Sequence, residues 1–64
     1  MVFVMVQGSK VRGVFDSIFH ARCFFSDTTG TPYKDIKEQV HINGDTLLLV
    51  NNYVQARLKQ TKFY

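Results

Sequence analysis

The sequence predicts a mainly β protein built as a small closed barrel. Two apolar runs, VFVMV at residues 2–6 and LLLV at residues 47–50, consist of residue types that favour strands. Both runs are apolar at every position, and a strand of this kind must be covered on both of its faces. A single-layer sheet of 64 residues can hardly provide that cover. A closed barrel whose strands also pack on neighbouring subunits can.

Length and composition limit the class of protein. A chain of 64 residues forms one domain with a marginal core, because so small a domain buries only about 60% of its unfolded surface. Its single cysteine cannot form an internal disulfide, and no Cys and His spacing suggests zinc. Self-association is the remaining common means of stabilisation. A free cysteine indicates an intracellular protein, cytoplasmic or nuclear. The run at 2–6 is too short for a membrane span and lacks the flanks of a signal peptide.

The first half of the chain opens with two strands. Residues 2–6 form the first strand, Gln7-Gly8-Ser9-Lys10 reads as a tight turn, and residues 11–15 resume as a second strand. Gly13 lies inside the second strand, where a glycine suggests a bend or a close backbone approach.

Residues 13–27 place one His, one Arg and the single Cys among four phenylalanines. A helix from Ser17 would give a shared face to Ile18, Ala21 and Phe25. Alternation with a period of two sorts the same residues more regularly and favours a bent strand or two strands. A helix over residues 17–26 stays open as the alternative.

The second half contains one clear hairpin. Residues 31–39 (TPYKDIKEQ) fit either a short helix with Pro32 at its first position or a loop leading into a strand. Two apolar runs within residues 40–50 flank Asn43-Gly44-Asp45, whose residues tolerate a positive φ. The basic segment from residue 51 onward is a short helix, a last strand or a flexible tail. We therefore expect a barrel over residues 1–50 and a basic C-terminal extension over residues 51–64.

Two motifs in residues 2–50 resemble those of Sm-like proteins, a family that includes the bacterial Hfq type. The first motif combines apolar residues with two spaced glycines and comprises Phe3, Met5, Gly8, Gly13 and Phe15; Ser17, Phe24 and Phe25 also fall where Hfq-type members have similar residues. The second motif is Ile42-Asn43-Gly44-Asp45, followed by TLLLV. The resemblance implies a strongly bent, five-stranded antiparallel barrel, usually preceded by a helix. It also implies rings formed by pairing of edge strands, alone or with other Sm-like subunits, which removes exposed edges.

The same resemblance implies RNA contacts. Sm-like proteins hold a uridine with a flat stacking side chain, an Asn at the base edge and a supporting Arg. The residues at or near the matching loops are His20, Arg22, Asn43, Gly44 and Asp45. His20 can stack on a base, and Arg22 can contact a phosphate or stack. The chain departs from the family, because its Asp position holds Phe19, its Asn position Cys23 or Arg22, and its Arg position Asn43. A preference for U-rich RNA is therefore not implied.

No motif indicates an enzyme, a metal site, a cofactor or a small-molecule substrate. Cys23 and His20, three apart on a strand, would point to opposite faces. Gly8-Ser9-Lys10 lacks the successive glycines of a phosphate loop. The net charge of +3 permits contact with phosphate without requiring it.

The sequence supports three hypotheses about function. The first is an Sm-like protein of RNA metabolism, and the second is a scaffold of Sm-like fold that binds only protein. The third is a small α+β inhibitor or accessory protein, such as a viral one, with a helix at 17–26.

Overall fold

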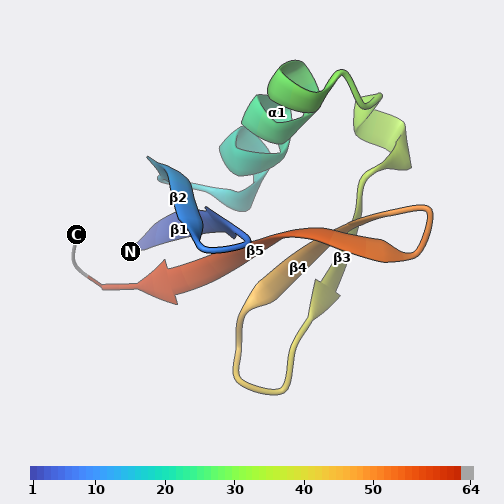
Figure 1. Ribbon diagram of the computed structural model, residues 1–64. Coiled ribbons are helices and arrows are strands. Elements are labelled where there is room, and N and C mark those ends of the chain that lie inside the picture. Colours follow the sequence, from blue (N-terminus) through green and yellow to red (C-terminus); the bar gives the residue numbers. More distant parts are fainter. Residues whose placement is uncertain (63–64) are drawn as a thin grey trace.

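A computed structural model, which describes residues 1–62, contains one five-stranded antiparallel sheet and one α-helix (Figure 1). The elements in chain order are β1 (Val2–Gln7), β2 (Lys10–Phe15), α1 (Ile18–Thr29), the 3-10 turn η1 (Tyr33–Asp35), β3 (Lys37–Val40), β4 (Thr46–Val50) and β5 (Tyr53–Thr61). The strand order is β2-β1-β5-β4-β3. The expected mainly β class with five antiparallel strands and a short helix is confirmed. The sheet is not closed into a barrel, because β2 and β3 form its two edges.

The β1–β2 hairpin follows the sequence expectation closely. Gly8 adopts φ 61° in the turn, a left-handed conformation that suits glycine. The register shifts between Met5 and Val6, and Gly13 lies opposite Met5. A Cβ atom on Gly13 would come within 2.9 Å of the Phe15 ring. The group that comes close to this glycine is therefore a side chain, the Phe15 ring, and not another stretch of backbone.

The strand expected over residues 17–26 is wrong, and the helical alternative is correct. The Ser17 hydroxyl accepts a hydrogen bond from the His20 backbone N–H at 3.1 Å and begins α1. Gly30 ends the helix at φ 73° and donates its N–H to the Ser26 carbonyl at 3.0 Å. Only Ile18 is β-branched in residues 18–27, so helix formation costs little side-chain entropy. Two capping residues therefore outweigh the period-two pattern.

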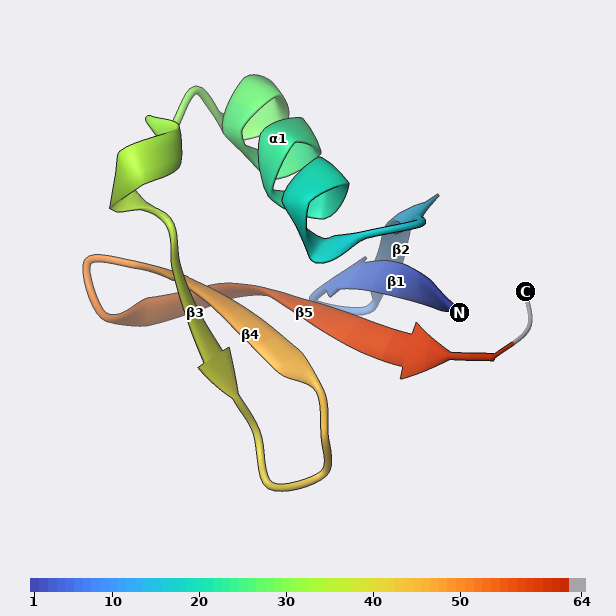
Figure 2. The ribbon, with the colours of Figure 1, turned by 180° about the vertical axis from the view of Figure 1, so that it is seen from behind.

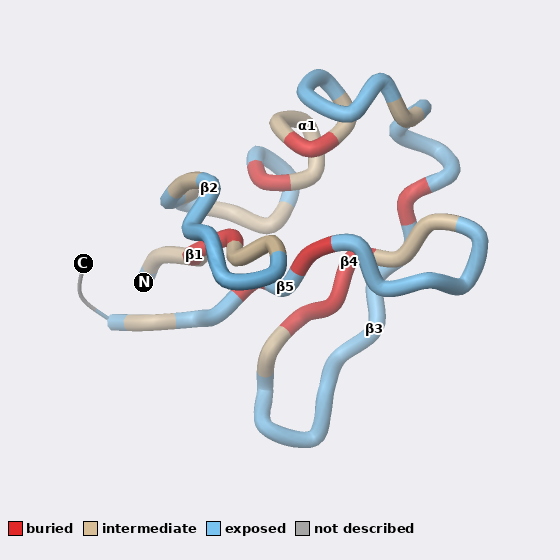
Figure 3. Tube along the Cα trace, in the orientation of Figure 1, coloured by how far each residue is buried: buried red, intermediate tan, exposed pale blue. Residues whose placement is uncertain are grey.

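The core lies between α1 and one face of the sheet. Figure 2 shows the helix crossing this face, and Figure 3 places the buried stretches of α1, β1, β4 and β5 toward one another. The core residues are Met5, Ala21, Phe25, Ile36, Leu48, Ala56 and Leu58. The rings of Phe15 and Phe24, 5.2 Å apart, pack against them at one end. The helix α1 thus covers one face of the two strands, β1 and β4, that are apolar on both faces.

The segment from residue 51 onward belongs to the sheet. Residues 53–61 form β5, which pairs with both β1 and β4 and is the central strand. Asn51 and Asn52, at φ 55° and 68°, make the turn that leads into it. Of the three alternatives for this segment, residues 53–61 adopt the last strand. Residues 63–64 of that expected extension lie outside the described residues.

The segment at residues 31–39, for which the sequence allows a short helix or a loop leading into a strand, contains a single helical turn and then a strand. Pro32 precedes η1, whose single turn ends at Asp35, and β3 begins at Lys37. Ile36, between them, is buried in the core. Within residues 1–62, neither α1 nor η1 is long and apolar enough to cross a membrane.

Candidate interaction surface

Arg22 is a structural clamp between α1 and the segment that leads into β3. Its guanidinium donates to the Ile36 carbonyl at 2.6 Å and to Glu38 Oε1 at 2.9 Å. Its Cζ lies 4.4 Å from the centre of the Tyr33 ring, a cation–π distance. Its Nε is buried and has no partner among the described residues. These donors point into the protein, so Arg22 does not present a free guanidinium to a phosphate or a base.

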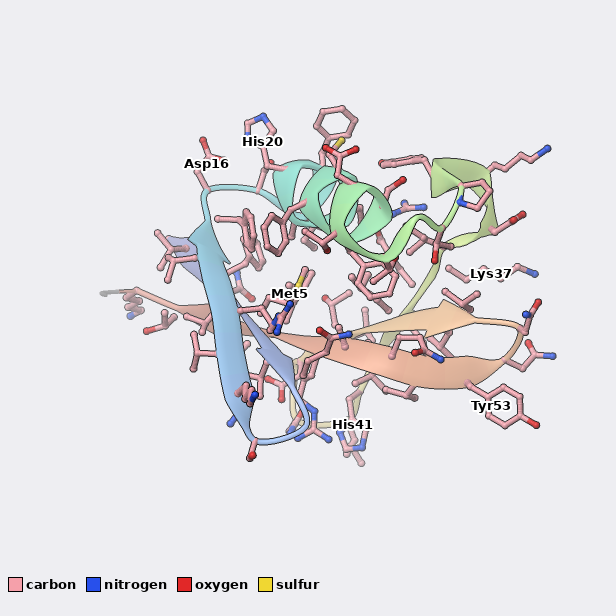
Figure 4. All side chains as sticks on the ribbon, turned by 45° about the horizontal axis from the view of Figure 1, so that its top comes forward. Met5, Asp16, His20, Lys37, His41 and Tyr53 are labelled. Atoms are coloured by element: carbon pink, nitrogen blue, oxygen red, sulfur yellow. The ribbon has the colours of Figure 1, made fainter. Side chains whose placement is uncertain are left out.

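His20 lies on the outer surface at the start of α1. Figure 4 shows its ring beside Asp16, and His20 Nδ1 is 2.5 Å from Asp16 Oδ1. The hydrogen bond from His20 lowers the pKa of the Asp16 carboxyl. The Phe19 ring, 58% exposed, lies 5.7 Å from the His20 ring and 6.0 Å from that of Tyr33. His20 therefore belongs to a small exposed aromatic cluster and is already paired through one nitrogen.

The helix changes the relation between His20 and Cys23. Residues three apart on a helix lie on neighbouring parts of its surface, so the expectation of opposite faces is wrong. A nucleophilic cysteine also needs hydrogen-bond contact with its base. Within residues 1–62, no hydrogen bond joins the His20 ring to the Cys23 thiol. The spacing alone thus carries no catalytic assignment.

Asn43, Gly44 and Asp45 form the turn between β3 and β4. Gly44, at φ 93°, donates its N–H to the His41 carbonyl at 2.9 Å. Asn43 Oδ1 accepts the Asp45 N–H at 3.0 Å, and Asp45 Oδ2 lies 3.9 Å from Arg57 Nε. Their polar groups thus stabilise the turn and its contact with β5.

The residues expected to contact RNA do not form one site. Figure 1 shows the turn at residues 41–45 at the far end of the β3–β4 hairpin, away from α1, which carries His20 and Arg22. The structure therefore separates these residues into a helix-side group and a hairpin-turn group. The loop pocket that the Sm-like resemblance implies would need them together.

A different surface, missed at the level of sequence, lies on the side of the sheet opposite α1. Met5 and Leu58 pair within the core, so their strand neighbours point the other way. Directly paired residues share a face. The aliphatic members of this face are Val2, Val4, Val6, Val11, Val14, Leu47, Leu49 and Val54; its cations are Lys37, Arg57 and Lys59. We call these residues the open face.

The cations on the open face lie among its aliphatic residues. Arg57 pairs with Val6 on one side and Leu47 on the other, and Lys59 pairs with Val4. Val4 and Leu47 are only 8% and 7% exposed, although α1 packs on the opposite side of the sheet. The long apolar stems of arginine and lysine can shield such neighbours while the charged groups stay in water. The register therefore makes the open face partly self-covered.

Other parts of the open face remain accessible. Val11, Val14 and Val54 are 57%, 40% and 55% exposed. A groove runs along β5, lined by Val6, Gly8, Val54, Arg57 and Lys59 among others. Exposed aliphatic residues on a face that also carries charged residues are typical of an interaction surface.

Charge is unevenly distributed between the helix side and the strands. Residues 16–36, which include α1 and η1, hold three acidic residues and two Lys or Arg. The rest of the chain holds two acidic residues and six Lys or Arg. The basic excess of the protein thus belongs to the strands, their turns and the C-terminal end.

Comparisons with protein-family models, curated proteins and solved structures found no match to this chain. The Sm-like resemblance therefore stays a hypothesis.

Proposed function

We propose that this chain is a non-enzymatic accessory or scaffold protein that binds another protein through its open face. The observation that carries the proposal is the composition of that face. Exposed Val11, Val14 and Val54 lie on the same side of the sheet as Arg57 and Lys59. Apolar residues that stay exposed beside charged ones are what a partner protein buries on binding.

The roles of the expected RNA-binding residues also support protein binding. Arg22 connects α1 to Ile36 and Glu38, and Asn43 and Asp45 stabilise a turn. A uridine pocket would need these polar groups to be free for the base. The helix at Ile18–Thr29 is the feature that the small accessory-protein hypothesis requires, whereas the Sm-like resemblance implies a helix before the first strand.

Self-association through the open face is disfavoured by its charge. Two copies stacked by this face would bring Lys37, Arg57 and Lys59 toward their counterparts, and like charges that approach in an interface cost free energy. Pairing of the edge strands β2 and β3 between copies, as the resemblance implies, stays a prediction that the solution mass would test. A partner other than a second copy is therefore the preferred occupant of the open face.

RNA is the second candidate partner, and the three cations of the open face favour it. Lys37, Arg57 and Lys59 can contact phosphates on any sequence. Binding of single-stranded RNA usually adds aromatic stacking platforms, and none of the residues that define the open face is aromatic. The aliphatic residues have no evident purpose in RNA binding, which is why protein ranks first.

Site-specific photo-crosslinking in cells tests the proposal. One variant carries a photoreactive residue at Val14 on the open face, and a matched variant carries it at Phe19, which is exposed on the helix side. We expect Val14 to yield a nuclease-resistant protein adduct that is absent at Phe19. The same adduct should disappear in Arg57→Glu. Adducts only at Phe19, or only nuclease-sensitive adducts at Val14, would contradict protein binding through the open face.

A further inference from the structure

The groove along β5 combines two chemistries within one short stretch. Val6 and Val54 contribute aliphatic walls, and Arg57 and Lys59 contribute positive charge. Gly8, in the β1–β2 turn, also lines the groove and adds no side chain. An occupant must therefore satisfy both apolar surface and cations at close spacing.

The cations of the groove are only partly neutralised by the protein itself. Among the described residues, Asp45 forms an ion pair with Arg57, and its carboxylate is 3.9 Å from Arg57 Nε. That distance is at the limit of an ion pair, and the Arg57 side chain is 48% exposed. Within residues 1–62, Lys59 and Lys37 form no ion pair. The groove and its surroundings thus carry an excess of positive charge that a partner can neutralise.

From this combination we infer that the groove binds an acidic, aliphatic segment of a partner protein. Carboxylates of that segment lie against Arg57 and Lys59, and its aliphatic side chains lie against Val6 and Val54. The inference rests on the proposed function and adds the chemistry of the partner. The basic groove and the acidic segment are complementary in charge. Such complementarity contributes more to the choice of partner and to the rate of association than to affinity.

The same observations distinguish this occupant from the others. A second copy of the chain would bring a net charge of +3 to an already basic face. RNA would neutralise the cations but leave Val6 and Val54 against ribose and phosphate, where aliphatic contact gives little. An acidic, aliphatic protein segment satisfies both parts of the groove.

Nuclear magnetic resonance titration of the full ¹⁵N-labelled chain tests the inference. The probe is a short synthetic peptide in which Glu alternates with Val, and the control peptide has Lys in place of every Glu. We expect the Glu peptide to shift the backbone amides of Val6, Arg57 and Lys59, and the Lys peptide to leave them unchanged. Binding should weaken steeply with added salt, because exposed charges are screened.

A pair of matched variants checks that charge at the groove is responsible. Lys59→Glu should weaken binding of the Glu peptide by about tenfold or more, since it replaces attraction by repulsion. Lys34→Glu makes the same change in charge at an exposed position of η1 and should weaken it by less than about twofold. Lys59 is exposed as well, so both variants should keep the dispersed spectrum of the folded chain.

Several results would overturn the inference. The first is equal binding of the Glu and Lys peptides. The second is a set of amide chemical-shift changes that lies mainly on α1. The third is an equal loss of affinity for the Glu peptide in Lys59→Glu and Lys34→Glu. If a short U-rich RNA binds at the groove and the Glu peptide does not, RNA replaces the acidic protein segment as the occupant of the groove. If the Val14 crosslink persists in Lys59→Glu, the open face still binds protein and only the acidic partner is refuted. If Val14 gives no protein adduct at all, the proposed function fails first.

Discussion

Replacement of Arg22 by alanine should destabilise the fold, because its contacts hold α1 to the β3 side of the sheet. The resemblance to Sm-like proteins implies that Arg22 contacts RNA, whereas in the structure its guanidinium contacts Ile36, Glu38 and Tyr33. A surface arginine that contacts RNA would contribute almost nothing to stability. The free energy of unfolding of Arg22→Ala therefore separates the two roles.

The expected magnitude follows from the individual contacts. The hydrogen bond to the Ile36 carbonyl comes from a charged donor and contributes about 1.5–3 kcal/mol. The pair with Glu38 is partly screened, because the two side chains are 19% and 36% exposed, and adds less than about 1 kcal/mol. The Tyr33 contact adds about 0.5–1 kcal/mol. Since such terms are not additive, we expect a loss of about 2–3 kcal/mol and a fall in Tm of roughly 10–20 °C.

Urea denaturation, monitored by circular dichroism, measures the loss in free energy of unfolding. Lys34→Ala is the matched control. Lys34 is exposed on η1, beside Tyr33, and its removal should change stability by less than about 0.5 kcal/mol. Arg22→Lys should fall between the wild type and Arg22→Ala, because an ammonium cannot reproduce the planar fork. An Arg22→Ala variant as stable as the control would refute the clamp and return Arg22 to the surface roles.

Three further predictions concern caps, packing and pH. Ser17→Ala should lower the free energy of unfolding by about 1 kcal/mol through loss of the cap on α1, and an unchanged urea midpoint would contradict it. Gly13→Ala should cost about 1–3 kcal/mol because the new Cβ displaces the Phe15 ring, and an ordered, unshifted Phe15 resonance would argue against this. The pKa of Asp16 should lie below 3.8 and rise toward that value in His20→Ala, as measured by carboxyl chemical shifts. Because this pKa is depressed, its stabilising effect is present above about pH 4 and lost as pH falls through the folded value.

Much of the sheet can be anticipated from the chain alone. VFVMV and VRGVF are strand-forming runs joined by a Gly8 turn, and Asn43-Gly44-Asp45 marks the β3–β4 turn. Each of these features depends on residues close together in the chain. Local steric preferences suffice to fix them.

The helix at α1 shows where sequence patterns mislead. Phenylalanines at residues 15, 19, 24 and 25 give apolar positions in almost any phase, so a period of two and a period near four both find support. The deciding signals were Ser17 and Gly30, twelve helical residues apart. Serine and glycine at this spacing are typical helix caps, whereas the prediction of a strand follows the alternation between them.

The candidate site was the part least accessible to sequence reasoning. Arg22 acquires its partners from residues 14 and 16 positions later, and no local pattern indicates such contacts. The open face depends on β5 lying between β1 and β4, which aligns Arg57 with Val6 and Leu47. The alternation of Ala56 and Leu58 with Arg57 and Lys59 is a visible sequence signal for a half-buried strand. It could have identified β5, although not its neighbours.

The sequence by itself determined the mainly β class, the single small domain, the two turns and the basic excess, because these follow from local conformational preference and composition. Only the tertiary structure decided which face of the sheet α1 covers, which cations lie on the open face, and that Arg22 points inward. Those outcomes depend on contacts between residues far apart in the chain, where burial and strand register assign each side chain to the interior or to a surface.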